Sequence, residues 1–145
     1  MTPRPLRFKV LVILLHALAG WAWCGALIAV ARQMLSLNAA LIIHAIGAPL
    51  GFAAISFFYF RRFAFTTPLR TAAAFLGVVA ALDLFLVAPF LERSYAMFAS
   101  PLGTWIPFAL IFVATYVTGR IVARRPHPTP KLPAQPVGPA PIFPV

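Results

Sequence analysis

The residue with the most chemical information in this sequence is an aspartate inside an apolar stretch. Asp83 is one of only two acidic residues among 145. A carboxylate in the hydrocarbon core of a bilayer costs about 2.5–3.5 kcal/mol on insertion scales, so we expect it to be protonated, hydrogen-bonded or turned toward a wet cavity. Two interpretations stay open: a neutral carboxyl group that joins neighbouring helices, which we favour, and a group that handles protons or ions.

His44 and Trp23 are the side chains expected to meet Asp83. Counted at 1.5 Å per residue from the outer end of each apolar stretch, Asp83, Trp23 and Cys24 lie about 10–12 Å deep, and His44 lies about 8 Å deep. Residues of one layer can meet if their helix faces turn inward, so an Asp83–His44 or Asp83–Trp23 hydrogen bond is predicted. For His44 alone, a buried imidazole satisfied within the protein is the simpler interpretation.

The sequence is poor in other site chemistry. Two carboxylates do not supply the oxygen ligands of a Ca²⁺ or Mg²⁺ site or the pair of a glycosidase. The single cysteine, Cys24, excludes an intramolecular disulfide and a thiolate zinc site. His16 and His44 differ in depth by about 14 Å, so they do not suit one haem within a subunit. We therefore expect no enzymatic activity, no metal and no cofactor.

Four apolar stretches must position these residues. Hydrophobic residues make up 62% of the chain and charged residues 10%, against about 45–50% and about 25% in soluble domains. About 20 residues of helix cross about 30 Å of hydrocarbon, and four stretches have that length: residues 10–31, 39–60, 71–91 and 103–123. The sequence thus predicts an all-α, four-helix transmembrane bundle over residues 10–125, disturbed at Pro49, Pro89 and Pro107.

Lys and Arg are distributed unevenly between the two ends of the predicted bundle. Ten flank the end that carries both termini and two flank the other end, so the positive-inside rule predicts that both termini, including residues 1–9, lie in the cytoplasm. The ten are Arg4, Arg7, Lys9, Arg61, Arg62, Arg70, Arg120, Arg124, Arg125 and Lys131, and the two are Arg32 and Arg93. Residues 126–145 contain eight prolines, which predicts a disordered cytoplasmic tail.

This charge pattern also bears on partners and location. A net charge of +10 suggests nucleic acid at first sight, but the basic residues flank apolar stretches, as they do in membrane proteins. We therefore expect no nucleic acid partner, and instead a lipid bilayer with anionic lipids on the cytoplasmic face. The expected location is a cell membrane, in the form of a multi-pass protein of a bacterial inner membrane.

Small residues recur at the spacing used for close helix contacts. Gly47 and Gly51 form a GxxxG pattern, and Ala73, Gly77 and Ala81 repeat at intervals of four. Such residues allow helix backbones to approach closely in membranes. Packing within the bundle is the default interpretation, and the alternative is a homo-oligomer or a larger membrane complex.

The segment from Ser94 to Phe108 is predicted as an outer loop leading into the last helix. Thr104 would cap that helix, Trp105 would anchor it at the interface, and Pro107 would lie in its first turn. A resemblance rests partly on this segment. The motifs LD at 82–83, FRRF at 60–63, MF at 97–98, LGTWIPF at 102–108 and TG at 118–119 resemble those of small four-span bacterial membrane proteins of unknown function. The resemblance covers about residues 40–120 and implies the architecture alone.

Two functional hypotheses follow. The first is a non-enzymatic, multi-pass integral membrane protein with an accessory, structural or interaction role. The alternative is a small proton-coupled transporter that uses Asp83 with His44. Small multidrug exporters resemble one another in carrying a glutamate in the first helix, where this chain offers only His16 and Cys24, so the first hypothesis is preferred.

Overall fold

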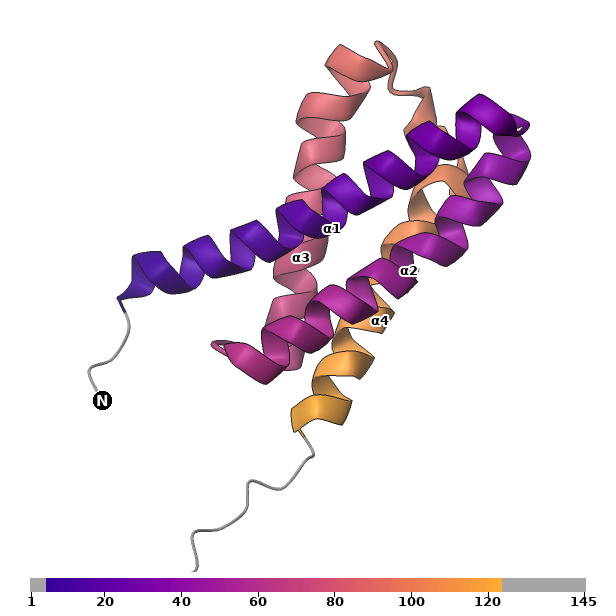
Figure 1. Ribbon diagram of the computed structural model, residues 1–145. Helices are drawn as coiled ribbons and strands as arrows, with labels where there is room; N and C mark the ends of the chain where they lie inside the picture. Colours follow the sequence, from indigo (N-terminus) through magenta and orange to yellow (C-terminus); the bar gives the residue numbers. More distant parts are fainter. Residues whose placement is uncertain (1–4, 124–145) are drawn as a thin grey trace, which may run out of the picture.

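Four long helices make up the fold of the described part of the chain, residues 5–123, in the computed structural model (Figure 1). No strand occurs in this range, and the predicted all-α bundle of four membrane-spanning helices is confirmed. The long helices are α1 (Leu6–Met34), α2 (Leu37–Arg62), α3 (Pro68–Leu82) and α4 (Ile106–Ala123). Between α3 and α4 lie the π-helix η1 (Asp83–Leu91), the 3-10 helix η2 (Ala96–Ala99) and the π-helix η3 (Pro101–Trp105).

The third and fourth spans are therefore composite. They run over Pro68–Leu91, with 24 residues, and over Pro101–Ala123, with 23 residues. All four spans are long and apolar enough to cross a membrane, which defines a multi-pass membrane protein. Each span begins two to four residues before its predicted apolar stretch, and the first two spans also end two or three residues after it, because backbone hydrogen bonds continue a helix whatever the polarity of its side chains. The predicted tail, residues 126–145, lies outside the described residues.

Hydroxyl side chains cap the starts of three spans. Ser36 Oγ accepts a hydrogen bond from Ala39 N–H at 3.4 Å, Thr67 Oγ1 accepts from Arg70 N–H at 3.4 Å, and Ser100 Oγ accepts from Gly103 N–H at 3.0 Å. Two of these caps are followed directly by proline, which suits the first position of a helix because its N–H would have no partner there.

The predicted cap at Thr104 is wrong. The fourth span begins three residues earlier, at Pro101, and Thr104 is buried within the π-helical turn. Its hydroxyl donates to the carbonyl of Met97 at 2.8 Å. Pro107 accordingly lies inside a continuous helical span, beyond its first turn.

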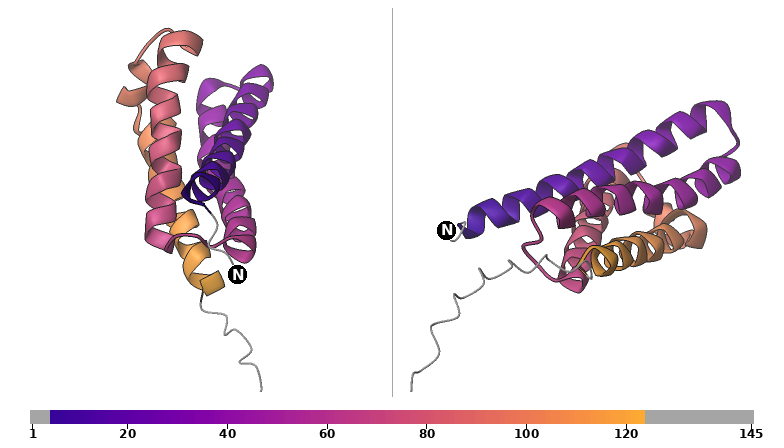
Figure 2. Two further views of the ribbon diagram at one scale, coloured as in Figure 1. Left: turned by 90° about the vertical axis from the view of Figure 1, so that its left-hand side faces the viewer. Right: turned by 60° about the horizontal axis from the view of Figure 1, so that its bottom comes forward.

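The bundle closes in the order α1, α2, α4, α3. The most extensive interface is between α2 and α4, followed by those of α1 with α2, α3 with α4 and α1 with α3. Figure 2 shows α1 and α2 on one side and α3 and α4 on the other. The start of α1, the α2–α3 connection and the end of α4 lie toward one end, which we call the basic end (Figure 1). The opposite end, with the α1–α2 connection, is called the loop end.

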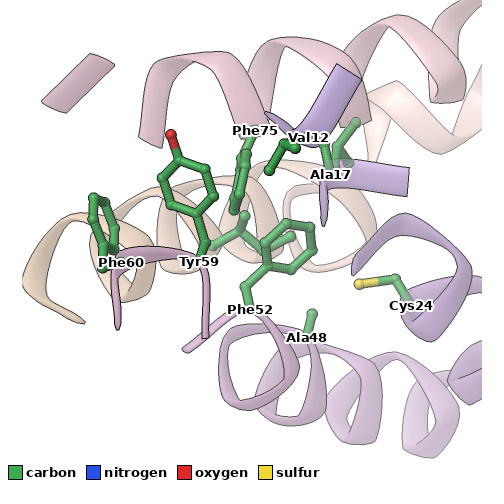
Figure 3. Packing of buried hydrophobic residues seen from close by; sticks show 10 residues of the cluster. Val12, Ala17, Cys24, Ala48, Phe52, Tyr59, Phe60 and Phe75 are labelled. Atoms are coloured by element: carbon green, nitrogen blue, oxygen red, sulfur yellow. The ribbon is translucent and has the colours of Figure 1, made fainter. Parts of the chain in front are cut away.

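An aromatic core holds the middle of the bundle together. The ring of Phe75 on α3 lies between those of Phe52 and Tyr59 on α2, with centroids 6.2 Å and 5.8 Å away (Figure 3). All three side chains are fully buried. A Cβ atom at Gly20 of α1 would overlap the Phe52 ring, so this glycine lets α1 approach α2.

Candidate functional site

Asp83 lies at the junction of α3 and η1 and faces α1. Its Oδ1 accepts a hydrogen bond of 3.0 Å from Nε1 of Trp21, and the pair is partly buried. The helix changes its hydrogen-bond register at this residue: the Asp83 N–H points at the carbonyls of Val79 and Ala80, and η1 follows with π geometry. Such π-helical turns are frequent at functional sites.

The structure does not pair Asp83 with either of the predicted partners. Trp23 turns away from Asp83, and its Nε1 donates to the carbonyl oxygen of Gly47 on α2 at 3.0 Å. The physical reason is angular: Trp21 and Trp23 are two residues apart on a helix, so their side chains point in roughly opposite directions, about 200° apart. Depth counting places both in the same layer but does not distinguish their faces.

His44 is also separate from Asp83. It lies one turn from both Ala40 and Ala48 on the buried face of α2. Its Nδ1 is a buried side-chain nitrogen without a hydrogen-bond partner among residues 5–123. The structure therefore does not bring the predicted cluster of Asp83, His44 and Trp23 together as one network.

Cys24 is a further polar group close to the Trp21–Asp83 pair. It follows Trp21 by three residues on α1, is buried, and lies within electrostatic range of the Asp83 carboxyl group. Its sulfur atom points into the aromatic core (Figure 3). No group of three or more His, Cys, Asp or Glu side chains that could hold a metal ion occurs within the described range.

A hydroxyl pair that sequence reasoning missed joins α2 to α4. Ser56 Oγ donates to Thr115 Oγ1 at 3.2 Å, and both side chains are completely buried. The available signal was a serine and a threonine inside otherwise apolar spans, a residue type that often bonds across membrane helices. Depth counting from the same outer end puts Ser56 about 25 Å and Thr115 about 18 Å deep, so it does not pair them, although α2 and α4 run in the same direction.

A second missed cluster lies nearer the basic end. The Tyr59 hydroxyl lies 3.4 Å from Thr66 Oγ1, which is 2.6 Å from Thr71 Oγ1. The His16 ring packs edge-on against Tyr59, with ring centroids 5.5 Å apart, and His16 Nδ1 lies 2.7 Å from the Val12 carbonyl. His16 thus belongs to the packing of α1 on the α2–α3 connection.

The two small-residue patterns have different surroundings. Gly47 and Gly51 face α1: added Cβ atoms would overlap the side chains of Leu27 and Trp23, respectively. This GxxxG pattern therefore packs α2 against α1 within the bundle.

The stripe of Ala73, Gly77 and Ala81 lies on the outer face of α3. All three residues are exposed, and a Cβ atom at Gly77 would meet nothing within 4 Å. The default interpretation, packing within the bundle, is wrong for this stripe. Each stripe residue follows a buried residue of α3 by two positions and so points about 200° away from the buried face. In a helix with apolar residues on every face, the sequence does not reveal which face turns outward.

One ion pair joins helices at the loop end. Arg32 Nη1, near the end of α1, lies 3.0 Å from Glu92 Oε1, just after η1, and both side chains are about half exposed. This pair takes up the second of the two acidic side chains of the sequence.

Comparisons with known proteins add no assignment. No family model matches the chain, and neither a curated protein nor a solved structure matches it. The class that the fold itself defines is a multi-pass, four-helix membrane protein.

Proposed function

We propose that this chain is a non-enzymatic accessory or interaction protein of a cell membrane. The observation that carries the proposal is the use of polar side chains inside the spans. Trp21 bonds to Asp83, Trp23 to the Gly47 carbonyl, and Ser56 to Thr115. Each bond connects two different helices, so these groups hold the bundle together instead of presenting a free nucleophile or base to a substrate.

The proposed setting is a bacterial inner membrane, with both termini in the cytoplasm. The support is the ten-to-two distribution of Lys and Arg over the whole sequence together with the positive-inside rule. In such a role the chain would act by contacting another membrane protein or a second copy of itself.

A second copy of the chain is the proposed partner at the outer face of α3. Ala73, Gly77 and Ala81 would allow two α3 helices to approach closely, as small residues do in membrane dimers. The test is disulfide crosslinking in native membranes of a Gly77→Cys variant in a Cys24→Ala background. A crosslinked dimer is expected, because the two Gly77 positions would lie near each other in a symmetric pair.

Gly25→Cys is the matched control for this experiment. Gly25 on α1 also has open space where a Cβ would stand, but it does not belong to the stripe. Dimers at position 77 and monomers at position 25 would support the proposal. Equal crosslinking at both positions would show random collision, and no crosslink at position 77 would remove self-association through α3.

Proton-coupled transport is the second candidate, and one observation favours it. The helix changes from α to π geometry at the carboxylate of the third span, and π-helical turns are frequent at functional sites. The test is proton-driven flux of a cationic dye in proteoliposomes. Flux by the wild type that is lost in Asp83→Asn, a side chain that cannot titrate, would establish transport over the accessory role. Wild-type protein without flux would exclude this candidate for such dyes.

A further inference from the structure

Six cationic side chains gather at the basic end of the bundle, with at least one from each long helix. Ring contacts hold the helix ends together there: Phe8 of α1 lies 6.0 Å from Phe65 of the α2–α3 connection, and Gly119 of α4 lies against Phe60 and Pro68. Five of the six side chains are exposed and the sixth, Lys9, is half-buried. The six are Arg7, Lys9, Arg61, Arg62, Arg70 and Arg120.

No acidic side chain of the protein neutralises these charges. The sequence contains two, Asp83 and Glu92. Asp83 accepts its hydrogen bond from Trp21 inside the bundle, and Glu92 pairs with Arg32 at the loop end. The counter-charge for the basic end must therefore come from another molecule.

The positions of two guanidinium groups indicate the depth at which that counter-charge lies. Arg61 Cζ is 5.3 Å from the centroid of the Phe57 ring, and Arg120 Cζ is 6.0 Å from that of the Tyr116 ring. In both cases the cation folds back by one helical turn over an aromatic residue of the same span. These charges are thus held beside the apolar part of the protein, and in a membrane-spanning helix this position matches the level of lipid headgroups.

We propose that the basic end binds the phosphate headgroups of anionic phospholipids. Guanidinium groups match the geometry of phosphate oxygens and form charge-assisted hydrogen bonds with them. A cluster of four to eight Lys and Arg residues beside membrane helices is the usual pattern of anionic-lipid recognition. The loop end, where Glu92 partly cancels Arg32 and Arg93, lacks such an excess. This inference concerns a lipid ligand and does not depend on the accessory role proposed above.

The experiment uses the purified full chain in a neutral detergent. Its melting temperature is measured while short-chain phosphatidylglycerol or phosphatidylcholine is titrated. A ligand that binds only the folded state raises the melting temperature with concentration, so phosphatidylglycerol is expected to raise it and phosphatidylcholine to leave it nearly unchanged. Both ends are accessible in detergent, so a charge variant cannot act by changing membrane insertion. Adding 0.5 M salt should weaken the effect because it screens exposed charges.

Three variants with single charge losses locate the binding surface. Arg120→Gln should weaken phosphatidylglycerol binding by about fivefold, the equivalent of about 1 kcal/mol per cation near an anionic surface. Arg70→Gln should do the same, and it is a second probe because Arg70 is exposed and outside the aromatic contacts. Arg93→Gln, the matched loss at the loop end, should keep wild-type binding.

Three results would overturn the proposal. The first is equal stabilisation by phosphatidylglycerol and phosphatidylcholine. The second is an equal loss in Arg93→Gln and Arg120→Gln, because binding would then follow net charge alone. The third is the same stabilisation by inorganic phosphate or by single-stranded DNA, which would make the basic end a general anion-binding or nucleic-acid-binding surface.

Discussion

Asp83 carries the single carboxyl group inside the spans, and this group accepts a hydrogen bond from Trp21 on another helix. This bond links α1 to α3, the least extensive of the four interfaces that close the bundle. An apolar pair at this position would leave that interface to packing alone. Bonds between membrane helices contribute about 0.6 kcal/mol on average and up to about 1.7 kcal/mol, so the pair adds specificity more than large stability.

Two substitutions of Asp83 test whether its side chain acts as a hydrogen-bond acceptor for Trp21 or as a buried charge without a partner. Asp83→Asn keeps a carbonyl acceptor for Trp21 Nε1, so the free energy of unfolding should change by less than about 1 kcal/mol. Asp83→Leu leaves the indole N–H without a partner and should cost about 1–3 kcal/mol. Denaturation in mixed detergent micelles measures both values.

A double-mutant cycle tests which indole is the partner. Trp21→Phe and Asp83→Leu should couple by about 0.5 kcal/mol or more, because contacting residues are not additive. Trp23→Phe is the control, since Trp23 bonds to the Gly47 carbonyl, and it should add to Asp83→Leu without coupling. Coupling with Trp23 in place of Trp21 would contradict the structure.

The Ser56–Thr115 pair supports a second prediction at this scale. Ser56→Ala removes one hydroxyl from a fully buried contact and should lower the free energy of unfolding by about 0.5–1.5 kcal/mol. Thr115→Ser keeps the hydroxyl group and should cost less than Ser56→Ala. The same micelle denaturation series measures both variants, and a neutral Ser56→Ala would show that the hydroxyl bond contributes nothing.

The sequence predicts the depth of polar groups better than their direction. Counting residues from the span ends places Asp83 at the level of the tryptophans of α1, and the structure has it bonded to one of them. The choice between Trp21 and Trp23 depends on which face of α1 turns toward α3. In a helix that is apolar all round, that information is nearly absent from the residue pattern.

Among the helices, the two π-helical segments, η1 and η3, are the main features that the sequence does not predict. Glu92 N–H bonds to the Val87 carbonyl, five residues back, at 2.9 Å. Pro89 lies inside this segment and has no N–H to contribute. The sequence predicts a disturbance at Pro89 but does not specify its form, because the register of hydrogen bonds depends on packing as well as on the proline.

The start of the fourth span shows a similar limit. Ser100 followed by Pro101 is a strong start signal, since both a capping hydroxyl and a first-turn proline are present. Thr104 also has a hydroxyl group that can cap a helix, but the next residue is Trp105 and not proline, so its start signal is weaker. The apolar pattern alone begins at about residue 103 and therefore predicts a cap that lies four residues after the observed one, Ser100.

Glycines differ in the space around them, and this difference predicts how the protein responds to a larger residue. Gly119 lies in a crowded contact between helices, and Gly77 lies in open space. An added Cβ at Gly119 would lie 2.6 Å from the Phe60 ring and 2.8 Å from Pro68 Cβ. Gly119→Ala should therefore destabilise the protein by about 1–3 kcal/mol through overpacking between α4, α2 and α3. Thermal melting in detergent measures this loss.

Gly77→Ala is the control for this prediction. It adds a methyl group where nothing lies within 4 Å, and alanine is the better helix former. Its melting temperature in detergent should equal or slightly exceed that of the wild type. If Gly77→Ala lowered the melting temperature as much as Gly119→Ala, the space around each glycine would not explain the loss of stability.

For the molecule as a whole, the number and order of spans follow from elementary constraints. Backbone groups in hydrocarbon need partners within the chain, so four apolar stretches of sufficient length become four helices. The neighbours of each helix do not follow in this way. Lipid-facing and partner-facing residues are both apolar, and large side chains such as Leu50, Phe58 and Phe85 are exposed around the bundle.

Membrane orientation is the prediction at this scale. Reporter fusions after Val145 and within the connection at 94–99 should show opposite sides of the membrane, with the C-terminal fusion in the cytoplasm. The reason is the excess of Lys and Arg at the end that carries the α2–α3 connection. A C-terminal reporter active only outside the cytoplasm would refute the orientation and, with it, a cytoplasmic location for the anionic-lipid surface.

The order of the spans along the chain, together with their neighbours in the bundle, sets a sequence of events during synthesis. Chains emerge from the ribosome with the N-terminus first, so α1 and α2 can meet as a hairpin before the rest exists. The indole N–H of Trp21 then has no partner until the third span, which carries Asp83, has entered the bilayer. Because α4 packs on both α2 and α3, the hydroxyl of Ser56 gains Thr115 only after the last span has entered. A nascent chain that stops before Pro101 would leave the face of α2 that packs against α4 uncovered, and this is the most extensive interface of the bundle.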